Sequence, residues 1–250
     1  MQFLAGKVGP TVWNMWESLF NEKEGTHALI IAGFFTPRKF VTDELLVPIA
    51  NWMQKGSQRE LSVFIGLTPI DGDERTKIVD SLIEVLANLL GRLEESERSR
   101  VHIHLVPYLH AKAYAIYEGN PRDFCSRESS CLKLLMGSSN LSLTAFANNF
   151  EFDAYLTRPE DAEALDNAAS MLQRLIETIY FGRTENDQPS IDCLDVYECE
   201  IGSIWGVNMD FYDALRLRMN EVSNKLSSSE YREIERFERQ QSEACLKADE

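Results

Sequence analysis

The sequence predicts an α/β protein in which a mixed β-sheet is flanked by helices on both faces and followed by a helical C-terminal extension. Apolar runs of strand length alternate with longer segments whose apolar residues recur at helical intervals. In chain order these segments read β-α-β-α-β-β-β-α. Strands joined by helices run parallel and need cover on both faces, while strands that follow one another directly pair antiparallel, so the sheet must be mixed.

The first half of the chain supplies the alternation of helices and buried strands. We expect helices over 11–20, 42–53 and 71–90, and strands over 28–35, 61–68 and 101–106. The run 28–35 is continuously apolar, which is typical of a parallel strand covered on both faces. Thr42 precedes Asp43 and Glu44 as a helix start, and Gly56 is a natural stop.

Three strands and one long helix are expected next, over 110–117, 131–136, 150–157 and 159–179. Side chains alternate between the faces of a strand, so in the first of these strands three alanines share one face with Tyr117. These small residues leave room for a helix to pack closely. The strand is therefore expected in the middle of the sheet, with Tyr117 in a structural role.

We expect one main domain over 1–182, a linker over 183–209 and a helical extension over 210–250. The composition becomes polar after Gly182, and helices are expected at 210–226 and 229–246. The sequence shows no internal repeat.

The formal net charge of −15 argues against a broadly basic nucleic-acid surface, although a local basic groove or a partner subunit could supply phosphate contacts. No apolar run reaches the roughly 20 residues of a membrane span, so we expect a cytoplasmic protein without membrane contact. The five cysteines form no C-x-x-C pair, which predicts neither a disulfide framework nor a zinc site.

Three histidines lie in or beside the expected strands. His102 and His104 are two residues apart on an expected strand and could be metal ligands, but no third ligand is evident nearby, which favours a polar strand face. His27 precedes the first buried strand and is expected at the surface.

Reactive polar residues lie at the start of the expected strand 110–117 and just after the end of the expected strand 131–136. His110 and Lys112 share one strand face, so an imidazole and an ammonium project together. A polar turn follows 131–136, and its hydroxyls, amide and backbone N–H groups can cradle a phosphate-like anion: Gly137, Ser138, Ser139 and Asn140. Glu151 and Asp153 lie on one face of the next strand.

This combination of H-x-K, G-S-x-N-L-S and a later acidic residue resembles the phospholipase D superfamily, in particular its nuclease and restriction-endonuclease branch with one motif per chain. The resemblance covers roughly residues 28–182. One departure is that the family pattern has an aspartate where this chain has Tyr117. Strand parity turns that position away from His110 and Lys112.

The resemblance implies a role for each matching residue. His110 would form a phosphohistidine, while Lys112 and Asn140, with Ser138, would bind the non-bridging phosphate oxygens. Glu151 would hold the ring nitrogen that the chemistry does not use, and Asp153 on the same strand face remains an alternative. No metal and no cofactor are implied.

One motif per chain implies a homodimer whose active site is composite. The function expected is that of a metal-independent phosphodiesterase, foremost a DNA endonuclease, with restriction or phage defence as its context. Two alternatives stay open: a binding or scaffold subunit that keeps the fold without turnover, to which Tyr117 and the acidity point, and a phospholipase-type phosphodiesterase.

Overall fold

A computed structural model of the chain describes residues 2–5, 12–33, 39–67, 84–107, 109–122, 129–139, 152–181 and 197–200. Its elements in chain order are β1 (Gln2–Ala5), α1 (Val12–Phe20), β2 (His27–Ala32), α2 (Lys39–Gln54), β3 (Glu60–Leu67), α4 (Glu95–Arg98), β4 (Val101–Pro107), β5 (Ala113–Glu118), β6 (Ser130–Gly137), β7 (Phe152–Thr157), α5 (Ala162–Phe181) and β8 (Tyr197–Glu200). Residues 84–91 are also helical. Within the described residues, no helix has the length and apolar character to cross a bilayer.

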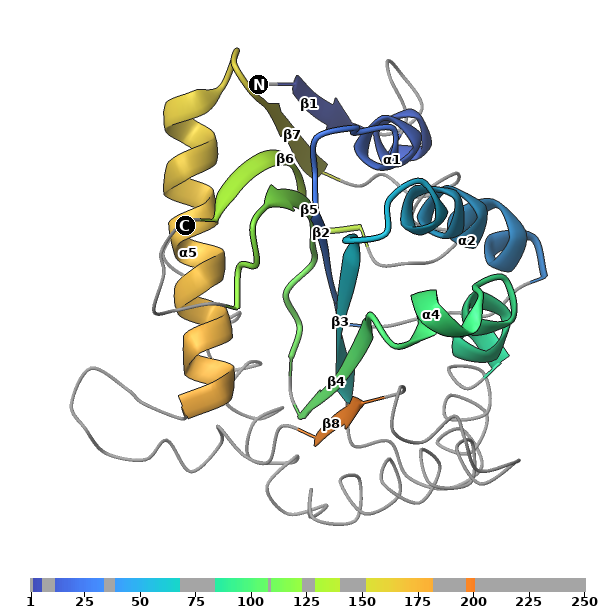
Figure 1. Ribbon diagram of the computed structural model, residues 1–250. Coiled ribbons are helices and arrows are strands. Elements are labelled where there is room, and N and C mark those ends of the chain that lie inside the picture. Colours follow the sequence, from blue (N-terminus) through green and yellow to red (C-terminus); the bar gives the residue numbers. More distant parts are fainter. Residues whose placement is uncertain are drawn as a thin grey trace, which may run out of the picture.

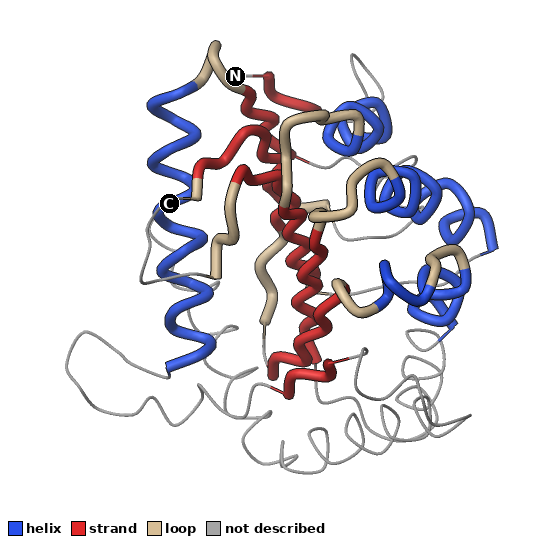
Figure 2. Tube along the Cα trace, in the orientation of Figure 1, coloured by secondary structure: helices blue, strands red, loops and turns tan. Residues whose placement is uncertain are grey.

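The strands form one mixed sheet in the order β1-β7-β6-β5-β2-β3-β4-β8. β2 pairs in parallel with β3, and β3 with β4, whereas the other neighbours are antiparallel. Figure 1 shows this sheet edge-on between two helical layers, with α5 on one side and α1, α2 and α4 on the other. Figure 2 shows the same separation of helix and strand by colour. The predicted fold class is confirmed in the described part of the chain.

Each face of the sheet carries its own apolar core. On β5, Tyr114 and Ile116 pack with α1 and α2, while Ala113, Ala115 and Tyr117 pack with Leu165, Leu172 and Ile176 of α5. β5 lies between β2 and β6. The expectation that the alanine face of this strand receives a helix, and that the strand is central, is therefore confirmed.

Several boundaries differ from those expected. β1 and β8 were not predicted, and β8 lies within the expected linker 183–209, where it pairs with β4 and extends the sheet. Only 84–90 of the expected helix 71–90 is described, where the helix continues to residue 91, and α4 occupies part of the charged segment after it. The expected helices at 210–226 and 229–246, and the rest of the extension 210–250, lie outside the described residues.

Candidate active site

The segment that carries His110 crosses the carboxyl ends of two parallel strands, β2 and β3. It comes so close that a β-carbon added to Gly66 would lie 2.0 Å from the carbonyl oxygen of Leu109. A β-carbon added to Gly33 would lie 3.2 Å from both Cα and Cδ2 of His110. The absence of side chains at these two glycines therefore allows the approach. The carboxyl ends of parallel strands are where open α/β sheets commonly bind ligands.

His110 and Lys112 lie just before β5. The strand begins at Ala113, whereas the sequence predicted that it begins at residue 110. His110 is exposed and Lys112 is half-buried. The Nζ atom of Lys112 donates a hydrogen bond to the carbonyl oxygen of His110 at 2.7 Å. The ammonium group thus lies against the backbone of His110, so the cation and the imidazole share one short segment.

The turn after β6 meets this segment through the backbone. The amide of Gly137 donates to the carbonyl oxygen of Lys112 at 3.3 Å. Ser138, the next residue, is exposed, whereas Ser139 is fully buried. The structure therefore brings His110, Lys112 and Ser138 to one end of neighbouring strands. Asn140 and Glu151 lie outside the described residues, and the roles of these five residues stay predictions.

Asp153, the alternative to Glu151, is hydrogen-bonded to Ser139 in the turn after β6. Its Oδ1 accepts from the amide of Ser139 at 3.1 Å, and its Oδ2 accepts from the hydroxyl of Ser139 at 2.5 Å. Tyr114 donates its hydroxyl to the carbonyl oxygen of Ser139 at 2.7 Å. Sequence reasoning missed Ser139 in this role, as it missed Gly33 and Gly66. A glycine at the end of each apolar run was the available signal for the latter two.

Tyr117 is 3% exposed and lies on the α5 side of β5, with Cys131 of β6 as its pairing partner. Burial raises the pKa of the Tyr117 phenol well above its usual value and that of the Cys131 thiol to about 12, so both stay neutral. Tyr114 faces the opposite side. The position where the resembling family has aspartate is thus filled here by a core residue, in line with strand parity.

Two of the three histidines on β2 and β4 are buried to an extent that the sequence did not predict. His27 is 1% exposed and hydrogen-bonds to the Ser62 hydroxyl at 2.9 Å, so its expected surface position was wrong. His104 is fully buried and stacks on Phe64, with ring centroids 4.3 Å apart. His102 is partly exposed. Only His102 matches the polar strand face that was expected.

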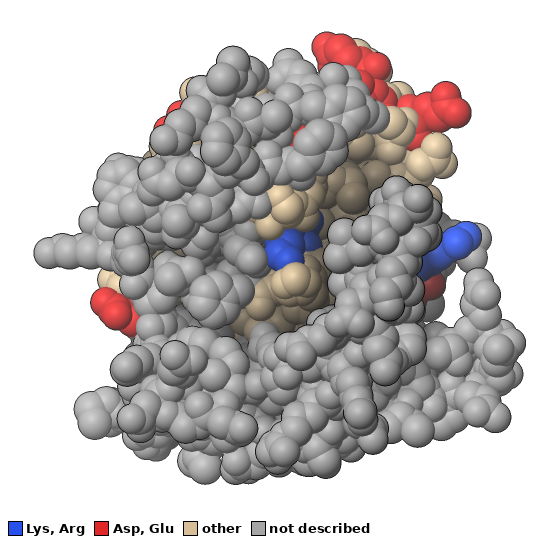
Figure 3. Space-filling model, turned by 180° about the vertical axis from the view of Figure 1, so that it is seen from behind, with Lys and Arg blue, Asp and Glu red and all other residues tan. Residues whose placement is uncertain are grey.

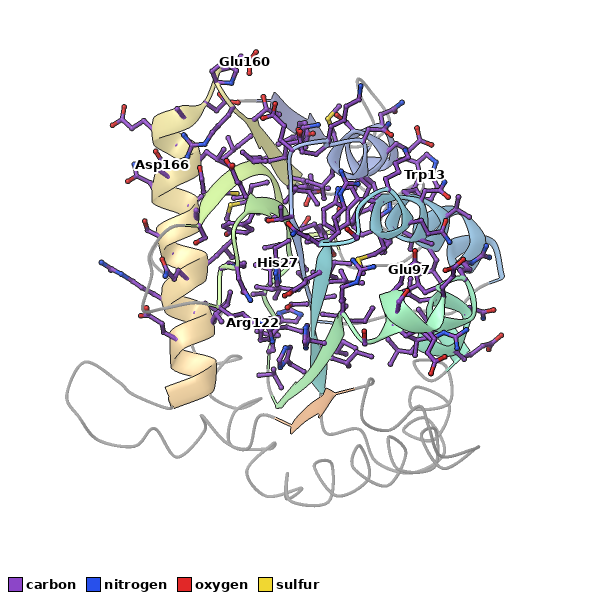
Figure 4. All side chains as sticks on the ribbon, viewed as in Figure 1. Trp13, His27, Glu97, Arg122, Glu160 and Asp166 are labelled. Carbon is purple, nitrogen blue, oxygen red and sulfur yellow. The ribbon has the colours of Figure 1, made fainter. Side chains whose placement is uncertain are left out.

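Charged groups surround these histidines. Glu60 lies 3.5 Å from the Nδ1 atom of His27, 4.0 Å from the Nε2 atom of His102 and 3.9 Å from the Arg122 guanidinium. Figure 4 shows His27 and Arg122 near each other on the α5 side of the sheet. Among the described residues, no group of three or more His, Cys, Asp or Glu side chains is arranged to hold a metal ion.

Burial, followed by the charge of Arg122, lowers the pKa of His102 to about 4 and that of His104 to about 3. Burial also lowers the pKa of His27, against the opposing effect of Glu60. The usual value of 6.5 applies after unfolding, so between pH 6.5 and about 4 the unfolded chain binds protons that the folded chain does not.

Stability should therefore fall as the pH drops from 6.5 towards 4, by roughly 1.4 kcal/mol per pH unit for the buried His104 and less for the partly exposed His102, while His27 contributes in the same direction. Urea unfolding at several pH values measures this slope. His104→Phe, which keeps the ring stacking on Phe64, should reduce the slope by about one proton. An unfolding free energy that stays constant from pH 7 to 4.5 would contradict the assignment.

Viewed from behind, the described surface shows Lys and Arg atoms among uncharged residues near the centre of the face and again at one edge, while acidic groups lie near the outline (Figure 3). The described part of this face therefore presents scattered basic groups and no broad basic surface. This distribution is in keeping with the net charge of −15.

Some solved structures are similar to this chain at low sequence identity. No protein-family model matches the sequence, and a search among curated proteins finds no relative. Nuc from Salmonella typhimurium, a phospholipase D family member, is similar with 13% identity and a TM-score of 0.43, covering 68% of this chain and 91% of Nuc. NucT from Helicobacter pylori is similar with 15% identity and a TM-score of 0.40, covering 65% and 85%.

Phosphatidylserine synthase from Haemophilus influenzae is similar over 89% of this chain and 45% of the synthase, with 12% identity and a TM-score of 0.49. In its H-x-K and G-S-x-N motifs, the chain resembles phospholipase D family proteins.

Proposed function

We propose that this chain is a metal-independent phosphodiesterase that cleaves DNA through a phosphohistidine at His110. The observation that carries the proposal is the backbone hydrogen bond from Gly137 to Lys112, which joins the two halves of the motif at the ends of adjacent strands. An exposed imidazole, an ammonium group and a hydroxyl-bearing turn then lie at one end of neighbouring strands. A phosphodiester needs a nucleophile and groups that bind its non-bridging oxygens, and this set contains both.

The reaction would proceed in two displacements. In the first, an unprotonated imidazole nitrogen of His110 attacks phosphorus, so that an N–P bond forms, a P–O bond breaks, and the leaving oxygen takes a proton from a second histidine. In the second, that histidine removes a proton from water, which attacks phosphorus and breaks the N–P bond. Lys112, Ser138 and Asn140 would bind the non-bridging oxygens, and Glu151 would hold the other ring nitrogen.

The second histidine is proposed to be His110 of a second copy of the chain. The other histidines of the sequence, at 27, 102 and 104, lie within strands β2 and β4 and not on the segment that carries His110, and His27 and His104 are buried. A twofold axis beside the site would bring two copies of His110 together in a homodimer. The exposure of His110 leaves it accessible for this.

DNA is proposed ahead of a phospholipid because one motif per chain and the absence of an evident interfacial helix in the sequence argue against a lipid surface. The negative net charge means that a partner subunit could supply part of the DNA affinity. Tyr117 was one of two reasons to consider a scaffold subunit without turnover. It is a core residue on the opposite face of β5 from Tyr114, so it no longer supports that alternative. A restriction or defence role would follow from DNA cleavage at defined sites.

Nicking of supercoiled plasmid in excess EDTA tests the proposal. The wild-type chain should convert plasmid to the open-circular form in chelator at the same rate as in magnesium, because His110 and Lys112 replace a metal as nucleophile and charge partner. A vesicle of phosphatidylcholine and phosphatidylglycerol serves as the comparison substrate. Cleavage that stops in EDTA and returns with magnesium would refute the mechanism, and release of lipid headgroup with intact plasmid would replace DNA by lipid.

A further inference from the structure

Ser139 is held by hydrogen bonds from both strands that flank β6. From β7, the Asp153 carboxylate accepts bonds from the Ser139 amide at 3.1 Å and from its hydroxyl at 2.5 Å. From β5, the Tyr114 hydroxyl donates to the Ser139 carbonyl oxygen at 2.7 Å. We call these three residues the Ser139 cluster. They fix the amide, the carbonyl and the side chain of one turn residue at the same time.

The Ser139 cluster is buried, with Tyr114 and Asp153 each 1% exposed and Ser139 at 0%. Burying a carboxylate is costly unless its oxygens are hydrogen-bonded, and the bonds to Ser139 meet that requirement. An apolar residue at 153 could fill the same position on β7 at lower cost. The pairing therefore favours a geometric role for the turn over a gain in stability.

The cluster packs against the core between the sheet and α1. The Trp16 ring of α1 packs edge-on against Tyr114, with ring centroids 5.2 Å apart, and its Nε1 atom donates to the carbonyl oxygen of Leu45 at 3.1 Å. Tyr155, two residues after Asp153 on β7, bonds its hydroxyl to Ser18 of α1 at 3.0 Å. Both flanking strands are thus tied to α1, which leaves the turn little freedom to shift.

The turn also borders the proposed site. Gly137 donates its amide to the carbonyl oxygen of Lys112, and the exposed Ser138 lies between Gly137 and the fixed Ser139. Ser138 is therefore held on both sides: by the segment that carries His110 and Lys112, and by the Ser139 cluster. A shift of Ser139 would pass directly to the Ser138 hydroxyl and its amide.

We propose that Asp153 is a positioning residue that acts through Ser139, aiming the Ser138 end of the turn at the phosphate bound by Lys112. The inference rests on the proposed function and assigns Asp153 a place that is distinct from holding the His110 ring. Asp153 does not touch the substrate. Its carboxylate sets where the turn's hydroxyl and N–H groups lie when negative charge develops on the phosphate oxygens.

Steady-state cleavage of a bis(p-nitrophenyl) phosphate probe in EDTA by Asp153→Asn and Ser139→Ala tests this role. An asparagine keeps the shape and one acceptor oxygen, but its amide nitrogen can only donate. The bond to the Ser139 hydroxyl must therefore reverse its direction, and both bonds lose the charged acceptor that holds the turn. Because misplaced oxyanion-binding groups weaken the transition state most, kcat should fall roughly 10- to 100-fold while KM changes little. Asp166→Asn, an exposed carboxylate on α5, is the matched control and should keep wild-type kinetics.

The double variant Ser139→Ala with Asp153→Asn should be no slower than the slower single variant, since both changes remove the same contact. Activity is compared well below each variant's unfolding temperature. Single variants that unfold earlier but keep the wild-type kcat and KM would overturn the inference and leave the proposed function intact. If Asp153→Asn does not fold, Ser139→Ala, which removes only a hydroxyl, decides. A wild-type chain inactive towards the probe and plasmid overturns the proposed function, and this inference with it.

Discussion

Replacing His110 by alanine should lower DNA cleavage by roughly 10³-fold or more, because the variant lacks the nucleophile in one copy of the chain and the proton donor in the other. The change should leave the fold in place, since the side chain is exposed and its described packing is against Gly33. Single-turnover cleavage of labelled duplex, together with thermal unfolding of the same sample, measures both effects.

His102→Ala is the matched control for this loss. It removes an imidazole that is also partly exposed, but on β4 and next to Glu60 rather than at the proposed site. It should cleave at the wild-type rate. Equal losses in the two variants would mean that histidine removal acts through stability, and a His110→Ala protein that still cleaves would remove His110 from the mechanism.

A dimer of one wild-type and one His110→Ala subunit should lose nearly all turnover, a loss far greater than one half. The single His110 that remains in such a dimer has no partner, so attack would proceed without a proton donor, or protonation without a nucleophile. Differently tagged subunits, mixed by unfolding and refolding and then separated by two affinity steps, provide the sample. The wild-type homodimer taken through the same steps is its control.

Subunits that work independently would instead leave the mixed dimer with about half of the wild-type rate. That result, or a protein that cleaves DNA as a monomer by light scattering, would separate catalysis by His110 from the composite site. His110 would then remain the proposed nucleophile, but the proposal of an active site shared between two subunits would be wrong.

The central part of the sheet could be predicted because periodicity alone determines it. In β5 the alternation of Tyr114 and Ile116 with alanines indicated which face meets a helix, and burial follows that alternation. β2 was evident as a continuous apolar run, and all six of its residues are buried between β3 and β5. Local pattern carries this information because each face of these strands has one kind of neighbour.

The edges of the sheet could not be predicted in this way. β1 and β8 have four residues each, and their partners lie far away in the chain: Gln2 pairs with Tyr155, and Glu200 with His102. Short edge strands are stabilised by the strand beside them, which no window of local sequence contains.

The burial of polar residues could not be predicted from the sequence either, because their partners also lie outside the local sequence. His27 is satisfied by Ser62 on the neighbouring strand, and Asp153 by Ser139, 14 residues before it. A polar side chain is expected at the surface until its partner is known. The motifs placed Lys112 and Gly137 at the ends of expected strands, and a backbone hydrogen bond joins these two residues. The glycines that admit the His110 segment, Gly33 and Gly66, became evident only from the close approach.

The most direct measurement of the central claim is the detection of a covalent phosphohistidine at His110. Duplex labelled next to the cleaved phosphate is mixed with the protein, denatured in alkali within the first turnover and digested for mass spectrometry, because an N–P bond of this kind survives alkali and breaks in acid. The account predicts label on the peptide that carries His110, lost on acid treatment and absent from His110→Ala. Label on another residue, or cleavage in the first turnover with no covalent label, would contradict it.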